Sequence, residues 1–188
     1  MAQATAPVPF ATRIRWNDRI KPFLVVVVLV AVAGWFGANV IAPRVAASQP
    51  HFLPEAFASL PSGSVLLTNP DGSAALLPVR IADTSTARAT GFKGVGERAM
   101  ENTFVFYPLA RETTARTSYA VDGTSTNVEF AAIDSTGTVV AIHNSVPGAS
   151  RVSIVERHQY LIGAKQGTLE NYGVVVGSTL DPEAIRRF

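Results

Sequence analysis

The 188-residue sequence has no cysteine, only three histidines and few charged residues. The lack of cysteine excludes disulfide bonds, thiolate metal sites and a cysteine nucleophile. Charged residues make up 16% of the chain and hydrophobic residues 47%, whereas soluble domains carry about 25% charged residues. The histidines, His51, His143 and His158, lack the spacing of a metal site, so a structural role is favoured for them. The composition indicates a membrane-associated chain with one modest domain.

One long apolar segment accounts for most of this composition. Residues 22–43 carry no charge and include the valine run Val25–Val28. About 20 helical residues cross a bilayer, and backbone in lipid must satisfy its own hydrogen bonds, so we expect a single transmembrane helix here. The alternative is a cleavable signal peptide, with the small residues 45–47 as its cleavage site. Signal-peptide cores span about 7–15 residues, so the greater length of this segment favours a retained anchor.

The flanking charges predict the orientation of this helix. Residues 1–21 carry four basic residues and one acidic residue, whereas Arg44 is the only charge between the helix and Glu55. Because basic flanks stay in the cytoplasm, we expect a single-pass protein of the inner membrane with a cytoplasmic tail and a periplasmic C-terminal domain. Residues 22–188 carry twelve basic and thirteen acidic residues. A nucleic-acid-binding domain clusters lysine and arginine on its folded part, so we expect no nucleic-acid partner.

Small residues and one amide form a strip near the outer end of the predicted helix: Ala33, Gly34, Gly37, Ala38 and Asn39. Such residues let a second helix approach closely, which predicts a helix-packing interface. Glycine and alanine are also frequent in membrane helices in general, so the alternative is that these residues reflect this frequency and form no interface. The segment has no histidine, methionine, cysteine or charge. We therefore expect it to hold no haem or redox metal, and we expect no cofactor.

The rest of the chain is predicted to be a linker followed by one outer domain. Residues 44–63 are rich in alanine, proline and serine and indicate an extended linker or arm, and residues 64–188 form a β-rich domain. We expect strands at residues 65–68, 74–82, 103–107, 128–133, 138–143, 160–164 and 174–176. Short helices are expected at residues 84–90, 168–172 and 182–187. The predicted fold class is α+β, mostly β.

The order of these segments resembles a known family. Val79–Thr84, followed by Arg88 and Gly91, is similar to the V-x-x-A-D-T … R-x-x-G opening of domain-of-unknown-function family 192. Phe130–Asp134 and the residues from Gly137 to Ile142 resemble its D-I-A-F-I-D-x-x-G-x-V-V-x-I hairpin. The resemblance covers roughly residues 78–180. It implies a small, barrel-like α+β domain that is often exported behind a signal or anchor, and it implies no reaction.

The sequence departs from the family where a polar and aromatic cluster is expected. The family reads F-W-M-K-N-T and then P-L-D, whereas this chain has Tyr119–Thr124 and then Asn127–Glu129. Gly163 stands where the family has a glutamate. If that cluster forms a pocket in the family, this chain has lost much of it while keeping the core pattern.

Candidates for chemistry are few, and we expect no catalytic residue and no metal site. Residues 91–96 hold three glycines but follow a predicted helix, so they are interpreted as a loop and not as a dinucleotide site. Arg111, Glu112 and Arg116 form a charged loop that is either a solvated edge or a partner-docking loop. Three carboxylates either approach one another or, as is usual at strand ends, form turns: Asp83, Glu129 and Asp134.

Two classes of function follow. In the favoured one, the chain is a non-catalytic accessory or structural subunit of a multi-subunit membrane complex, such as a photosynthetic or respiratory assembly. Its partners are then the lipid bilayer and other transmembrane subunits, and its outer domain caps or clamps the assembly. In the other, it is a free-standing anchored periplasmic domain that binds a small ligand or has an enzymatic activity of unknown kind.

Overall fold

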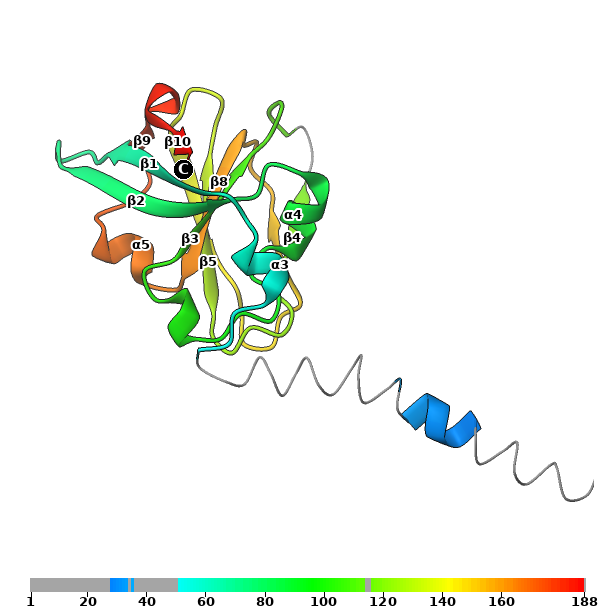
Figure 1. Ribbon diagram of the computed structural model, residues 1–188. Coiled ribbons are helices and arrows are strands. Elements are labelled where there is room, and N and C mark those ends of the chain that lie inside the picture. Colours follow the sequence, from blue (N-terminus) through cyan, green and yellow to red (C-terminus); the bar gives the residue numbers. More distant parts are fainter. Residues whose placement is uncertain (1–27, 34, 36–50, 114–115, 188) are drawn as a thin grey trace, which may run out of the picture. The chain divides into compact units, whose positions relative to one another are not determined.

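The computed structural model describes residues 28–33, 35, 51–113 and 116–187. The chain divides into two units, Met1–Ile41 and Ala42–Phe188. In the first unit, residues 28–33 and 35 are helical and exposed (Figure 1). No helix within the described residues is both long and apolar enough to span a membrane. The other residues of the expected 22–43 helix, including Gly34, Gly37, Ala38 and Asn39, lie outside the described part of the chain, as do residues 1–21.

The second unit is built mainly of β-strands, in agreement with the predicted α+β, mostly β class. Its main sheet has eight strands in the order β10-β1-β2-β3-β8-β5-β6, with β9 pairing β1 (Figure 1). The strands of this sheet are β1 (Ser62–Thr68), β2 (Ala74–Ile81), β3 (Phe104–Pro108), β5 (Val128–Ile133), β6 (Val139–Asn144), β8 (Tyr160–Lys165), β9 (Thr179–Leu180) and β10 (Arg186–Arg187). Strands β2 and β3 run parallel, and the other neighbours in this sheet are antiparallel.

The sheet curls until its two ends are linked. Strand β9 pairs with β1, and its Thr179 also bridges to Thr138, the residue before β6. The backbone N–H of Leu180 donates to the carbonyl of Gly137 at 2.7 Å. A Cβ at Gly137 would lie 2.5 Å from the Leu180 carbonyl oxygen, so this approach needs glycine. The result is a partly closed barrel.

Smaller elements cover both faces of this sheet. Strands β4 (Thr117–Ala120) and β7 (Arg151–Ile154) form a separate antiparallel pair. The helices are α3 (Glu55–Ala58), α4 (Ser85–Thr90) and α5 (Thr168–Asn171), and the 3₁₀ turns are η2 (Arg98–Met100) and η3 (Pro182–Ala184). In Figure 1, α3, α4 and β4 lie on one side of the sheet and α5 lies on the other.

The alternation of side chains along the strands divides the buried residues into two clusters. On β3, Val105 and Tyr107 belong to the cluster that also holds Phe57 of α3. Phe104 and Phe106 point the other way, into the cluster that holds Leu169 of α5. Because both faces are buried, β3 and β5 read as nearly continuous apolar runs instead of alternating ones.

Most of the expected elements are present. The 128–143 hairpin is confirmed, and Thr84 caps α4 by accepting a hydrogen bond from the N–H of Ala87 at 3.1 Å. The expected strand at 174–176 is wrong: these residues form a loop between Gly173 and Gly177, both at positive φ, which bends the chain in spite of its valines. The expected helix at 182–187 is also wrong, because it stops after the single turn η3 and residues 186–187 pair with β1 as β10.

The second half of the expected arm belongs to the folded unit. Of residues 44–63, the structure describes residues 51–63. Phe57 and Leu60 are buried in the core. The carbonyl of Phe52 accepts a hydrogen bond from the N–H of Gly96 at 2.8 Å, and Arg80 Nη1 donates to the carbonyl of Leu60 at 3.1 Å. From His51 onward the chain is therefore packed on the outer domain.

Candidate functional site

The predicted docking residues lie between β3 and β4, where the structure describes residues 109–113 and 116. The N–H of Leu109 donates to the carbonyl of Gln159 at 2.9 Å, and the N–H of Thr113 donates to the carbonyl of His158 at 2.9 Å. The N–H of His158 in turn donates to the Thr113 hydroxyl at 3.1 Å. These three bonds fasten the first half of the loop to the segment that precedes β8.

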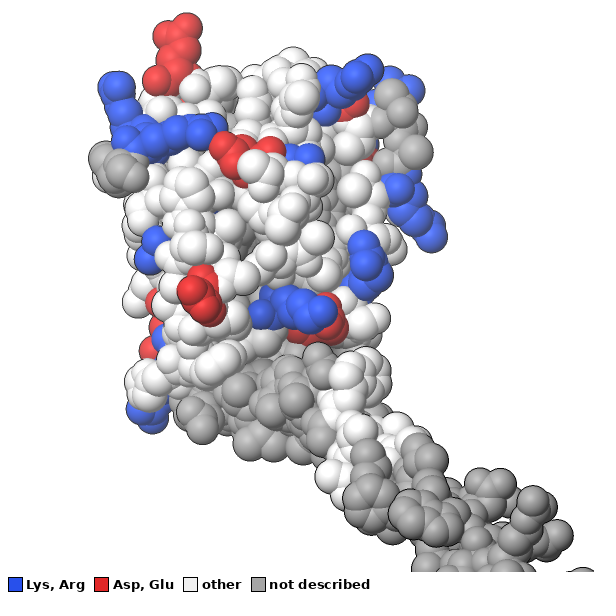
Figure 2. All heavy atoms as spheres, turned by 45° about the vertical axis from the view of Figure 1, so that its right-hand side comes forward, with Lys and Arg blue, Asp and Glu red and all other residues white. Residues whose placement is uncertain are grey.

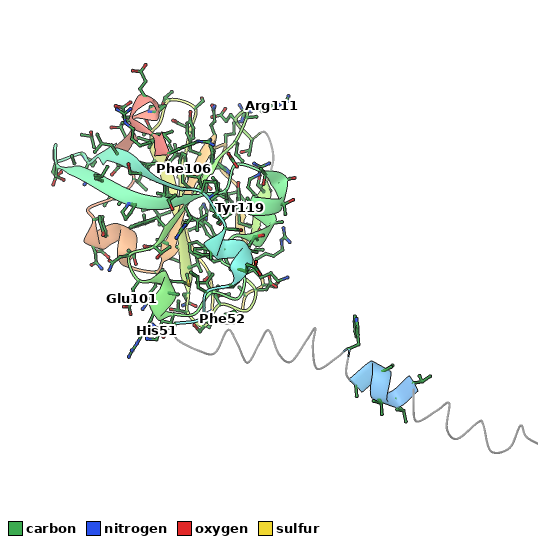
Figure 3. All side chains as sticks on the ribbon, viewed as in Figure 1. His51, Phe52, Glu101, Phe106, Arg111 and Tyr119 are labelled. Atoms are coloured by element: carbon green, nitrogen blue, oxygen red, sulfur yellow. The ribbon has the colours of Figure 1, made fainter. Side chains whose placement is uncertain are left out.

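The three docking residues differ in their exposure and contacts. Arg111 and Arg116 are exposed, and neither forms an ion pair within the described residues. Figure 3 shows Arg111 at the rim of the domain. Glu112 is half-buried, and its Oε1 accepts a hydrogen bond from the N–H of Ser135 at 3.4 Å. On the described part of the face shown in Figure 2, basic and acidic side chains are scattered around uncharged surface.

A buried histidine lies behind the loop, and its pattern of bonds fixes its tautomer. His158 is fully buried, with Nδ1 2.9 Å from the carbonyl oxygen of Glu156 and Nε2 2.8 Å from the hydroxyl of Tyr119. A carbonyl oxygen only accepts, so Nδ1 carries the hydrogen and Nε2 accepts from Tyr119. Burial lowers the pKa of His158 and raises the pKa of Tyr119 to about 12. Both groups are therefore neutral at pH 7, and the pair holds the loop without a charge.

Next to this pair, three aromatic rings meet in the core. The ring centroids of Tyr107 and Tyr119 are 5.3 Å apart, and that of Phe130 lies 6.2 Å and 5.8 Å from them. The Tyr107 hydroxyl is buried with no hydrogen-bond partner among the described residues, and burial raises its pKa. A Cβ at Gly91 would lie 3.0 Å from this hydroxyl. Any side chain at position 91 would therefore crowd the Tyr107 hydroxyl, and glycine leaves space for it.

Gly163 explains the loss of the family cluster in steric terms. A Cβ at this position would lie 2.6 Å from the ring of Phe92 and 2.8 Å from the ring of Phe130. The glutamate that the family places here has no room, because the two rings occupy its volume. The ring centroids of Phe92 and Phe130 are 6.3 Å apart, and the two rings meet edge to face. In this chain, aromatic packing fills the place expected for the polar cluster.

The other histidines have protein partners. His143 Nε2 lies 2.5 Å from Glu156 Oε2, and the pair is partly buried. His51 Nε2 lies 3.3 Å from Arg98 Nη1 on the surface. Within the described residues, no three histidine, aspartate or glutamate side chains gather in the way metal ligands do.

The three carboxylates at strand ends are engaged separately. Asp83 pairs with Arg187 at 2.8 Å. Glu129 is buried, and its Oε1 accepts a hydrogen bond from the N–H of Leu169 at 2.6 Å. Asp134 accepts bonds from within the turn that follows β5, as its position predicts. The expectation that Glu129 forms a turn is wrong: it lies within β5, and its partner is 40 residues away, a contact that no local pattern signals.

The comparisons with known proteins agree with this fold. No curated protein matches the chain. A protein of Sinorhizobium meliloti 1021, described as a candidate transcription regulator, has a crystal structure with TM-score 0.57 and 22% identity that covers 65% of this chain and 95% of its own. A protein of unknown function from Novosphingobium aromaticivorans DSM 12444 has TM-score 0.54 and 16% identity, covering 72% of this chain and 96% of its own. At these identities the likeness shows the fold alone.

A match between the sequence and a family profile shows which family the chain belongs to. The profile of the DUF192 family, described as Uncharacterized ACR, COG1430, matches residues 66–182. This range contains the Ala-Asp-Thr opening at residues 82–84, the 128–143 hairpin and Gly163. The chain therefore belongs to the DUF192 family.

Proposed function

We propose that the chain is a non-catalytic accessory subunit of a multi-subunit membrane complex, photosynthetic or respiratory. A single helix at residues 22–43 anchors it, with residues 1–21 in the cytoplasm and the outer domain in the periplasm. The strip from Ala33 to Asn39 packs against other transmembrane subunits. The outer domain then caps or clamps the assembly through the loop at residues 109–116.

The observation that carries this proposal is the geometry of that loop. Hydrogen bonds of Leu109 and Thr113 fasten residues 109–113, which include Arg111, to the segment before β8. Arg111 and Arg116 are both exposed and form no ion pair in the described residues. A fastened loop loses little conformational entropy on binding. Arginine is also enriched in protein interfaces because its planar guanidinium pairs with carboxylates in two-pronged fashion. An acidic patch on a neighbouring subunit is the partner that fits.

Two further observations support a non-catalytic, anchored role. Phe92 and Phe130 fill the space beside Gly163, so a substrate has no access there. In the described part of the helix, Val30 and Trp35 have exposed fractions of 67% and 65%. Water penalises such apolar exposure, whereas lipid or a neighbouring helix covers it favourably.

Purification of the full chain in a mild detergent tests the proposal. We expect the chain to migrate with identified transmembrane subunits at fixed stoichiometry. Replacing Gly34 and Gly37 together by leucine should release it, because the bulky side chains keep helices apart. Replacing Arg111 and Arg116 together by alanine should reduce the amount of chain that co-purifies with the assembly, because the loop contacts are lost. Arg186 is an exposed arginine on β10, and Arg186→Ala should leave co-purification unchanged.

If the purified protein is instead a single 19.9 kDa chain without stoichiometric partners in several mild detergents, the subunit proposal is overturned. This result would favour the alternative, a free-standing anchored domain that binds a small ligand or has an enzymatic activity.

A further inference from the structure

A surface hollow lies beside α5, away from the loop at residues 109–116. It has a volume of about 270 Å³ and is bounded by residues 101–102, the end of β8 at residues 165–166, and α5 with Tyr172 after it. Glu101, on its wall, lies at the same end of the domain as His51 (Figure 3). Ligand pockets for drug-sized molecules measure about 300–1,000 Å³, so this hollow suits a ligand of one small ring.

The walls of this hollow carry polar groups that the fold does not use. Asn102, Gln166 and Asn171 are exposed residues of the lining, and none of the three makes a side-chain hydrogen bond within the described residues. The same holds for the hydroxyl of Tyr172. A carboxamide offers two donor hydrogens and an acceptor oxygen at a fixed distance. Three of them around one hollow match a ligand whose groups both donate and accept.

The charges of the hollow argue against an anionic ligand. Lys165 Nζ lies 3.0 Å from Glu97 Oε1 and 3.8 Å from Glu101 Oε1, so its positive charge is already met by two carboxylates. An incoming anion would have to displace them and would face their repulsion. The Glu101 carboxylate and the Lys165 ammonium still offer acceptor and donor capacity to neutral hydroxyl groups.

The walls are also held in place before any ligand arrives. Asn102 has φ of 55°, in the left-handed region, which asparagine adopts more readily than other residues with a side chain. On the opposite wall, the buried Glu129 accepts from the N–H of Leu169, and the carbonyl of Tyr172 accepts from Asn69 at 3.3 Å. These bonds fix α5 against the sheet.

We propose that this hollow binds one neutral saccharide unit. The hydroxyl groups of a sugar ring both donate and accept, as carboxamides do, and carry no charge to conflict with the Glu97–Lys165–Glu101 group. Asn102, Gln166 and Asn171 are the binding residues, and Glu129 positions α5. This site is independent of the anchor and of the docking loop, so either proposal stands without the other.

The test uses the full chain in a detergent without a sugar headgroup, labelled with ¹⁵N. D-glucose, D-galactose and N-acetyl-D-glucosamine are the probes, and inorganic phosphate is the anionic comparison. We expect at least one sugar to shift the side-chain amide signals of Asn102, Gln166 and Asn171 with saturation, and phosphate to leave them unchanged. If phosphate alone shifts them, or if no sugar does so up to its solubility limit, the proposal is overturned.

Two variants show whether the hollow is responsible. Gln166→Ala and Asn171→Ala each remove a carboxamide that has no partner in the described fold, so both proteins should keep the parent thermal unfolding curve. Each should weaken sugar binding about tenfold, which corresponds to one lost hydrogen bond. Asn144→Ala removes an exposed carboxamide from β6 and should change nothing. Equal affinity in all three variants would place the sugar elsewhere and refute the site.

Discussion

At Gly163 the absence of a side chain allows two phenylalanine rings to lie against β8. The close approach of Phe92 and Phe130 to this position means that glycine is required for packing and not for backbone freedom, since Gly163 is not at positive φ. Sequence comparison reveals that the family glutamate is missing, but it does not reveal which side chains replace it. Phe92 lies in a glycine-rich loop 71 residues earlier, so only the folded structure links the two positions.

Adding one methyl group at this position should be costly. We expect Gly163→Ala to lower the free energy of unfolding by about 1–3 kcal/mol, because an overfilled core must shift its rings. Urea denaturation of the full chain measures the change. Phe92→Leu in the same protein should recover part of the loss by making room. Unchanged stability in the single variant would mean that the rings yield freely and that the filled-site interpretation is wrong.

Among the elements, α5 is held by its surroundings more than by its own sequence. Four helical residues are too few to be stable alone in water. The carboxylate of Glu129 accepts the N–H of Leu169 at its first turn, and Gly173, at φ 73°, ends it. A buried strand residue thus supplies the cap that a local serine or aspartate usually provides.

Removing this distant cap should loosen α5 selectively. In Glu129→Ala the N–H of Leu169 stays buried without a partner, which costs about 1–3 kcal/mol. We expect faster amide hydrogen exchange in residues 168–174 and a smaller effect in the β5–β6 hairpin. Glu129→Gln keeps an acceptor oxygen and should show a weaker change, and Glu170→Ala, exposed on the same helix, should show none. Uniform acceleration across the domain would argue against a local cap.

Element prediction from the sequence succeeded where the local signals were strong. The 128–143 hairpin has long apolar strands and an Asp-Ser-Thr-Gly turn, and Asp134 accepts hydrogen bonds from Thr136 and Thr138 as such turns require. Strands β4, β7, β9 and β10 were not predicted, since they span only two to four residues and exist because of pairing partners far along the chain. In the candidate site, the exposed arginines were predicted, whereas His158 and its bonds to Tyr119 and Thr113 are tertiary contacts that leave no local pattern.

For the whole molecule, the buried His158–Tyr119 pair makes stability depend on pH. Protonating His158 would place a charge in the core and would leave the Tyr119 hydroxyl hydrogen without its acceptor. Burial therefore keeps the pKa of His158 below its usual 6.5, while the unfolded chain titrates at about that value. In the window between the two values the unfolded state binds more protons than the native state, and folding weakens as the pH falls.

The full stabilisation should be present above pH 6.5 and should be lost progressively as the pH drops toward the lower pKa of His158. We expect His158→Gln to be less stable at neutral pH but to show a flatter slope of stability between pH 7 and pH 5, as measured by thermal unfolding. His51→Gln, at an exposed histidine, should keep the parent slope. Parallel slopes for the parent and His158→Gln would show that another group governs the acid response.

The pairing of β1 has a mechanical consequence. Just after the chain enters the outer domain, β1 is joined to β2 along its whole length and to β9 and β10 on its other side. A pull on the residues ahead of His51 therefore loads three strand neighbours together, two of them from the last ten residues of the chain. Such a force spreads through the curled sheet instead of peeling the domain from its first strand. Strands β9 and β10 thus help to hold β1 in the sheet when force is applied ahead of His51.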